Sequence, residues 1–222
     1  MSREIPAAFR LRETGRPRGV AERAGILLHG RDRTKQEMFD LVAALDLAGM
    51  RWLAPAADAG KWYPNRYAEP LASNEPHLSR AVERCDRVVQ EAGEGGRLSP
   101  DRIALVGFSQ GACLALEYAL RHPGKVGALV VLTGALIGPP GTVWRPASGK
   151  SLRGLRVFLT GSDIDDWVAE RSVRETARVL EALGAEVHLR IYVGRPHVVS
   201  REEIAEAREF LERIGLRLQP CP

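Results

Sequence analysis

The feature that most constrains this chain is a glycine-framed turn at residues 107–111, which reads Gly-Phe-Ser-Gln-Gly. An apolar run at residues 103–106 precedes it, and a helical pattern at residues 112–120 follows it. A G-x-S-x-G turn between strand and helix is typical of a nucleophile elbow, where a strained backbone projects the serine hydroxyl above the sheet. A glycine-rich turn with an incidental serine is the alternative. The context on both sides favours the elbow, which makes Ser109 a candidate nucleophile.

Short apolar runs alternate with longer amphipathic ones along the chain. This alternation predicts strands and crossover helices that build a mostly parallel sheet. Thr34 with Glu37 and Ser200 with Glu203 have the spacing of capping boxes that open helices. We expect strands at residues 25–28, 52–54, 103–106, 126–132, 156–159 and 186–192, with helices from residue 34, at 76–90, 112–120 and 169–183, and from residue 200. The order is that of an α/β-hydrolase core, in which the active site lies at the carboxyl ends of the strands.

The length of the chain favours one folding unit. Its 222 residues are 45% hydrophobic, enough for a substantial core, and they contain no stretch that resembles an interdomain linker. We expect a single α/β domain over residues 1–222, with residues 1–24 leading into the sheet. The chain is too short for a large cap domain, so the pocket is expected to be open and shallow.

Charge and cysteine usage exclude several function classes. The net charge is only +4, and arginines alternate with glutamates along helices, which argues against nucleic-acid binding. The N-terminus is charged throughout, and no apolar stretch approaches the ~20 residues that span a bilayer. We therefore expect no membrane span and a cytoplasmic location. Cys85, Cys113 and Cys221 are odd in number and lack C-x-x-C spacing, which argues against a disulfide framework or a zinc site.

A serine nucleophile needs a histidine to accept its proton and an acid to orient that histidine. In this fold both follow the serine in the chain, the acid first. His197 comes directly after the last predicted strand, where the general base belongs. The other histidines have structural explanations: His29 shapes the loop after the first long strand, and His77, His122 and His188 lie at helix ends or on a strand surface.

The acid belongs on the loop at residues 161–168, after the strand at 156–159. Three aspartates compete there: Asp163, Asp165 and Asp166. Counting residues does not choose among them. Each could instead cap the following helix, because a carboxylate is favoured at a helix start.

An oxyanion hole requires two backbone N–H groups aimed at the developing charge. One comes from the residue after the nucleophile and one from the loop that follows His29, which indicates Gln110 and Arg31. Since both contribute main-chain groups, their side chains could vary. Asp32 lies beside this loop, and its carboxylate would oppose an oxyanion, so we expect it to point away or to pair with an arginine such as Arg33.

These segments together resemble one enzyme family, from about Ile26 to Phe210. The residues that carry the resemblance are Leu28-His29-Gly30-Arg31, Trp62-Tyr63-Pro64, Gly107-Phe108-Ser109-Gln110-Gly111-Ala112, Leu136-Ile137-Gly138, residues 161–168 and His197. They are similar to the phospholipase/carboxylesterase family of α/β-hydrolases, which includes bacterial carboxylesterases and acyl-protein thioesterases. The combination of Gly-Phe-Ser-Gln-Gly with Trp-Tyr-Pro is far more specific than the elbow alone.

The resemblance carries site roles with it. In this family the acid stands three residues before a hydrophobe, which selects Asp165, ahead of Val168, with Asp163 as the second choice. The resemblance also implies His197 as base and Arg31 and Gln110 as oxyanion donors. It implies that four residues border the acyl-binding side: Trp62, Tyr63, Leu136 and Trp167. Trp62 and Tyr63 could also be plain core.

Some positions depart from the family pattern. Asp32 replaces a glycine, Ala169 replaces a proline, and Arg195 lies in a turn that is otherwise a proline-glycine run. Asp32, Arg195 and Trp167 could narrow or charge the site. They bear on the choice of substrate more than on the type of reaction.

The expected activity is hydrolysis of short- to medium-chain carboxylic esters by a serine carboxylesterase through an acyl-enzyme. The resemblance implies a small-molecule ester as substrate, no metal and no organic cofactor, and a monomer or homodimer. An acyl thioesterase or lysophospholipase with the same triad is the main alternative. A catalytically silent domain that only binds a ligand is the other, and a fluorophosphonate probe would distinguish it from a competent serine hydrolase.

Overall fold

The computed structural model describes residues 11–215, so Cys221 and residues 1–10 of the predicted N-terminal segment lie outside the described residues. Seven strands form one sheet in the order β1-β3-β2-β4-β5-β6-β7. Among the strands of residues 11–215, only the pairing of β1 with β3 is antiparallel, which confirms the predicted mostly parallel sheet. The strands are β1 (Arg12–Gly15), β2 (Arg23–Leu28), β3 (Met50–Ala54), β4 (Ile103–Phe108), β5 (Ala128–Leu132), β6 (Arg156–Ser162) and β7 (Glu186–Tyr192).

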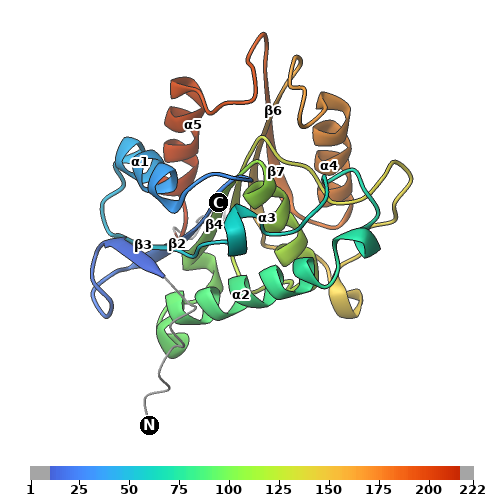
Figure 1. Ribbon diagram of the computed structural model, residues 1–222. Helices are drawn as coiled ribbons and strands as arrows, with labels where there is room; N and C mark the ends of the chain where they lie inside the picture. Colours follow the sequence, from blue (N-terminus) through green and yellow to red (C-terminus); the bar gives the residue numbers. More distant parts are fainter. Residues whose placement is uncertain (1–10, 216–222) are drawn as a thin grey trace, which may run out of the picture.

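Helices cover both faces of the sheet (Figure 1). The helices α1 (Lys35–Leu45) and α5 (Arg201–Glu212) pack on one face. The helices α2 (His77–Ala92), α3 (Gln110–Arg121) and α4 (Glu170–Ala182) pack on the other. Amphipathic spacing explains this arrangement, since the buried residues of α2 recur every three or four positions and give one apolar stripe.

The core has two layers because side chains alternate across each strand. In β4, Leu105 packs with α2 and α3, whereas Val106 and Phe108 pack with α1 and α5. All residues of β3, β4 and β5 are buried, as expected for parallel strands that are covered on both faces. The apolar runs of the sequence are therefore the interior strands.

The outer parts of the chain differ from the prediction in detail. The strand β1 lies within the segment expected only to lead into the sheet, and Glu13 on this strand pairs with Arg51 on β3 at 2.9 Å. Thr34 caps α1 by accepting from the N–H of Glu37 at 3.3 Å. Ser200 and Glu203 form a complete capping box at the start of α5. The remaining elements are short 3-10 turns at Asp58–Gly60, Leu71–Asn74, Glu94–Gly96, Pro100–Arg102 and Ala147–Gly149.

The loops at the carboxyl ends of the parallel strands gather at one edge of the sheet. They follow β2, β4, β6 and β7, and they carry the residues that the sequence indicates for chemistry. The two longest connections between described elements, residues 55–76 and 133–155, contain only short 3-10 turns. In the described part of the chain, nothing forms a separate cap over this edge.

Candidate active site

Ser109 occupies the turn between β4 and α3 with φ 51° and ψ −117°. A positive φ is unfavourable for a residue with a side chain, and such strain persists only where the surroundings impose it. Here the flanking glycines allow the close approach. A Cβ on Gly107 would lie 2.5 Å from the backbone of Gly111, and one on Gly111 would lie 2.1 Å from the carbonyl oxygen of Leu28. Only glycine fits at either position.

The structure brings Ser109, His197 and Asp165 together from three separate loops. The Oγ of Ser109 lies 2.9 Å from Nε2 of His197, and Nδ1 of the same ring lies 2.8 Å from Oδ2 of Asp165. The proton on Nδ1 therefore faces the carboxylate, and Nε2 is left to accept from the serine hydroxyl. This arrangement can take the proton from a nucleophilic serine.

Asp165 is the aspartate of its loop that reaches the imidazole. It is buried, and its Oδ1 also accepts from the N–H groups of Trp167 and Val168, both at 2.8 Å. Burial acts to raise the pKa of Asp165, but the hydrogen bonds from His197 and these two amides outweigh burial and leave it lowered. Asp163 instead accepts from the N–H of Gly194 at 2.7 Å and braces the neighbouring turn.

The side chains of the two residues expected at the oxyanion hole form hydrogen bonds of their own. Gln110 is buried, and its side chain accepts from the N–H of Trp62 at 3.0 Å and donates to the carbonyl of Tyr63 at 2.7 Å. The guanidinium of Arg31 donates to the carbonyls of Tyr63, Pro64 and Asn65 at 2.6 to 3.1 Å. These side chains hold residues 62–65 against the loop, which is a contact that the main-chain role alone does not predict.

His29 holds the other side of the same loop. Its ring is buried, its Nε2 accepts from the N–H of Ala57 at 3.0 Å, and its Nδ1 therefore carries the proton and donates to the carbonyl of Gly30 at 2.8 Å. Burial lowers the pKa of His29, and the hydrogen bond to Gly30 opposes that shift without cancelling it. The lowered pKa keeps the ring neutral. Trp62 completes the arrangement, because its indole N–H donates to the carbonyl of His29 at 2.8 Å.

Arg195 points into the protein and does not charge the site. One guanidinium nitrogen donates to the carbonyl of Val198 at 2.6 Å and bonds to the carboxylate of Glu203, and the other donates to Thr133 Oγ1 at 3.0 Å. The hydroxyl of Ser162 donates to the carbonyl of Arg195. This buried network ties the loop that carries the histidine to β5, β6 and α5. In the sequence, this network was indicated only by the presence of an arginine in a turn that is otherwise a proline-glycine run.

Asp32 also lies away from the site. Its side chain is exposed, it adopts φ 55°, and its nearest cation is Lys61 at 4.0 Å. The expected partner, Arg33, pairs with Glu37 instead at 3.3 Å. Of the two alternatives expected for Asp32, the structure therefore favours an outward direction over a pairing with Arg33.

Ser109 and Gln110 line a cavity of about 50 Å³ on one side of the elbow. Tyr63 and Trp167 line it, as the resemblance implies. Cys113 lines it as well, and burial raises the pKa of this thiol to about 11, so the thiol is protonated and weakly nucleophilic. The cavity is small and adjacent to the serine.

Two of the four residues expected on the acyl side do not line this cavity. Leu136 is buried in the core beneath the site, and its N–H donates to Thr176 Oγ1 at 3.0 Å. Trp62 is buried with its indole directed at the loop of His29, so the core interpretation holds for its side chain. Trp167 is exposed, and its ring lies 6.1 Å from the ring of His197 and 5.3 Å from the guanidinium carbon of Arg66.

Two broader features bear on function. Over residues 11–215 no helix is both long enough and apolar enough to cross a bilayer. Within the same range, no three or more histidine, cysteine, aspartate or glutamate side chains form a group that could hold a metal ion.

Comparison with known proteins gives consistent matches. A protein described as a phospholipase/carboxylesterase from Dyadobacter fermentans is 32% identical, with a TM-score of 0.83 over 91% of this chain and 95% of the other. The Bacillus cereus carboxylesterase, at 18% identity, shares the fold with a TM-score of 0.75 over 94% of this chain and 96% of its own. Acyl-protein thioesterase 1 of Mycosarcoma maydis is 26% identical over 161 residues, which are 64% of this chain and 63% of that protein.

The curated relatives are matched over only part of their length, from 34% to 63%. The family match is wider. The sequence profile described as phospholipase/carboxylesterase matches residues 13–214, from β1 to the end of α5. On this evidence, the chain belongs to the phospholipase/carboxylesterase family of α/β-hydrolases.

Proposed function

We propose that this protein is a serine carboxylesterase that hydrolyses short- to medium-chain carboxylic esters through an acyl-enzyme. The observation that carries the proposal is the chain of hydrogen bonds from Ser109 Oγ to His197 Nε2 at 2.9 Å and from His197 Nδ1 to Asp165 Oδ2 at 2.8 Å. Such a chain activates a hydroxyl that is otherwise a poor nucleophile near neutral pH.

The reaction runs in two halves. Ser109 Oγ attacks the carbonyl carbon of the ester while His197 Nε2 takes the hydroxyl proton, and the carboxylate of Asp165 stabilises the imidazolium. The oxyanion accepts from the backbone N–H groups of Gln110 and Arg31. The first of these belongs to the initial turn of α3, where no intrahelical acceptor exists. The C–O bond then breaks, and His197 donates its proton to the departing alcohol oxygen.

The second half returns the enzyme to its starting state. Water attacks the acyl carbon, gives its proton to His197 Nε2, and forms the same type of oxyanion. Collapse of that intermediate releases the carboxylic acid and returns the proton to Ser109. The cavity beside the serine, about 50 Å³ in volume, supports short acyl groups over long ones.

A thioesterase is the second candidate, because several relatives are named acyl-protein thioesterase 1. The same residues would cleave a C–S bond by the same two halves. Comparing kcat/KM for an oxoester and a thioester with the same acyl group distinguishes the two. A preference for the thioester above about tenfold would favour this candidate over the carboxylesterase.

The direct test is hydrolysis of p-nitrophenyl esters across acyl lengths by the wild-type protein and by Ser109→Ala. We expect activity that is highest on short acyl groups, and a variant reduced to the background rate. The exposed Ser99 provides a matched control, since Ser99→Ala removes a hydroxyl far from the site and is expected to retain full activity. Equal rates for wild type and Ser109→Ala would refute the proposal. A fluorophosphonate probe is expected to label only proteins that retain Ser109.

A further inference from the structure

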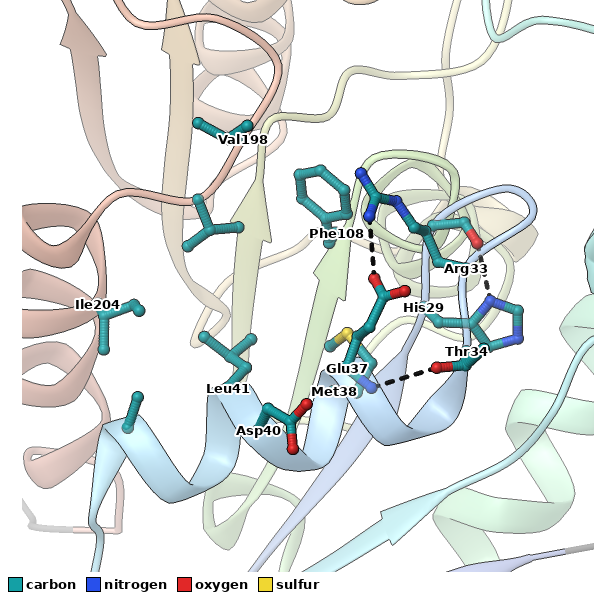
Figure 2. Close-up of a pocket in the computed structure, with 13 residues that line it drawn as sticks. His29, Arg33, Thr34, Glu37, Met38, Asp40, Leu41, Phe108, Val198 and Ile204 are labelled. Atoms are coloured by element: carbon teal, nitrogen blue, oxygen red, sulfur yellow. Dashed lines mark hydrogen bonds and ion pairs between the residues drawn. The ribbon is translucent and has the colours of Figure 1, made fainter.

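A second cavity, with a volume of about 340 Å³, is lined by Phe108, the chain neighbour of Ser109. It is bounded by α1, by the loop after β2, and by the segment that joins His197 to α5 (Figure 2). Its volume falls within the range of small-molecule sites, roughly 300 to 1,000 Å³. The proposed mechanism, which uses the smaller cavity for the acyl group, leaves this one without an assigned ligand.

The lining of this cavity is mainly apolar. Figure 2 shows Phe108, Val198, Leu41 and Ile204 around it, drawn from four different elements of the fold. The charged groups stand at one edge, where Glu37 points toward Arg33 and pairs with it at 3.3 Å. With Asp40, the edge carries two carboxylates against one guanidinium. Such a site favours a neutral apolar group over an anionic one.

Backbone connectivity joins this cavity to the proposed chemistry. Its lining residues Gly30, Phe108 and Val198 are the direct chain neighbours of the proposed oxyanion donor, nucleophile and base. Consecutive Cα atoms are 3.8 Å apart, so the backbone of each of these three lining residues lies next to a residue proposed to react. The ring of Phe108 also lies 5.2 Å from the ring of His197. The cavity therefore borders the segments that carry the proposed reacting groups, although Ser109 and His197 do not line it themselves.

Resting on the proposed function, we propose that this cavity binds the alcohol portion of the ester and selects neutral, apolar alcohols such as aryl alcohols. The leaving oxygen must lie against His197 Nε2 to receive its proton, so the alcohol departs on the side of the histidine loop. Val198 and Phe108 place the cavity on that side. The acyl group binds in the smaller cavity, which Gln110 and Trp167 line.

The test changes the alcohol while the acyl group stays constant. Ethyl acetate and 2-naphthyl acetate form the same acetyl-enzyme and differ only in the leaving group. Ala44 lines the cavity at an exposed position on α1, so Ala44→Phe fills it from the surface. Ala43 is the matched control, because it is also exposed on α1 but does not line the cavity. Thermal melts verify that both variants fold.

We expect Ala44→Phe to lower kcat/KM for 2-naphthyl acetate by about tenfold, the scale of steric discrimination in an apolar pocket. Ethyl acetate is expected to change by less than about twofold, and Ala43→Phe to leave both unchanged. Hydrolysis of the acetyl-enzyme is expected to continue at the wild-type rate, since the alcohol has already left. For the wild type, a sulfonate on the naphthyl ring is expected to reduce kcat/KM by about threefold or more at low salt.

Contrary results separate this inference from the proposed function. If Ala44→Phe slows hydrolysis of long acyl-enzymes whatever the alcohol, the cavity holds acyl chains and the assignment is overturned. An equal effect on both acetates, or none, would also overturn it, and Ser109-dependent esterase activity would still stand. A wild-type protein inactive on every ester would overturn the proposed function and this inference together.

Discussion

The buried pair between Arg195 and Glu203 gives a quantitative test of what holds the histidine loop. Arg195→Met removes the guanidinium and keeps most of the apolar stem. The two side chains are only 7% and 0% exposed, so water cannot replace the lost partner. The carboxylate of Glu203 would retain the hydroxyl of Thr160 and the N–H of Ser200 as its donors. An insufficiently compensated charge would then remain in the interior.

Removing one member of a buried ion pair costs about 3 to 5 kcal/mol. In a chain of this size 1 kcal/mol shifts Tm by about 2 to 4 °C, so Arg195→Met is expected to lower Tm by about 6 to 20 °C. Burial raises the pKa of Glu203, and Arg195 opposes that shift in the wild type. The folded wild type already holds the Glu203 proton more tightly than the unfolded chain does, and loss of Arg195 strengthens that hold, so the destabilisation grows as pH rises from 5 to 8.

The assay is thermal and urea unfolding at pH 5 and pH 8, with kcat measured alongside. Arg208→Met is the matched control, because Arg208 pairs with Glu212 at an exposed position. Its loss is expected to lower the free energy of unfolding by less than about 1 kcal/mol. The double variant Arg195→Met with Glu203→Leu removes both charges of this pair and is expected to be more stable than Arg195→Met alone. A Tm for Arg195→Met equal to that of Arg208→Met would refute the reasoning.

Three further predictions concern the candidate site itself. Asp165→Asn is expected to lower kcat by roughly 10⁴-fold, because an amide favours the wrong tautomer of the imidazole, while Asp163→Asn stays near wild type; steady-state kinetics on one ester compares them. Gly111→Ala is expected to reduce the yield of folded protein or lower Tm, since its Cβ would lie 2.1 Å from the carbonyl oxygen of Leu28; a normal melt would contradict the packing. Burial lowers the pKa of His29, so below its ordinary value near 6.5 the unfolded chain binds a proton that the folded protein excludes. Its contribution to stability is therefore present above pH 6.5 and declines as pH falls, and urea unfolding from pH 7.5 to 5.5 is expected to show a shallower decline for His29→Gln.

Much of the fold could be predicted from the sequence because the patterns that indicate strands and helix starts are local. Apolar runs gave the interior strands, and the Ser200 and Glu203 capping box gave the start of α5. The strand β1 was not predicted, because an exposed edge strand lacks the apolar pattern that marks a buried one. Its pairing depends on β3, which is distant in the sequence.

The candidate site divides in the same way. The elbow at Ser109 could be recognised from its five-residue pattern, and the loop of His197 from its place after the last strand. The roles of Gln110 and Arg31 as side-chain clamps were missed, since their partners at residues 62–65 are 30 or more positions away. The inward direction of Arg195 was missed for the same reason, as Thr133 lies far from it in the chain.

The sequence by itself determined the fold class, the family and the segments that carry the candidate chemistry, because strand and helix periodicity and the G-x-S-x-G pattern each extend over only a few residues. The tertiary structure decided which aspartate meets His197, that Trp62 and Leu136 belong to the core, and that two cavities of unequal size flank the elbow. Those outcomes depend on side chains from separate loops that meet only when the sheet assembles. Their distances and directions are properties of packing, which no local pattern encodes.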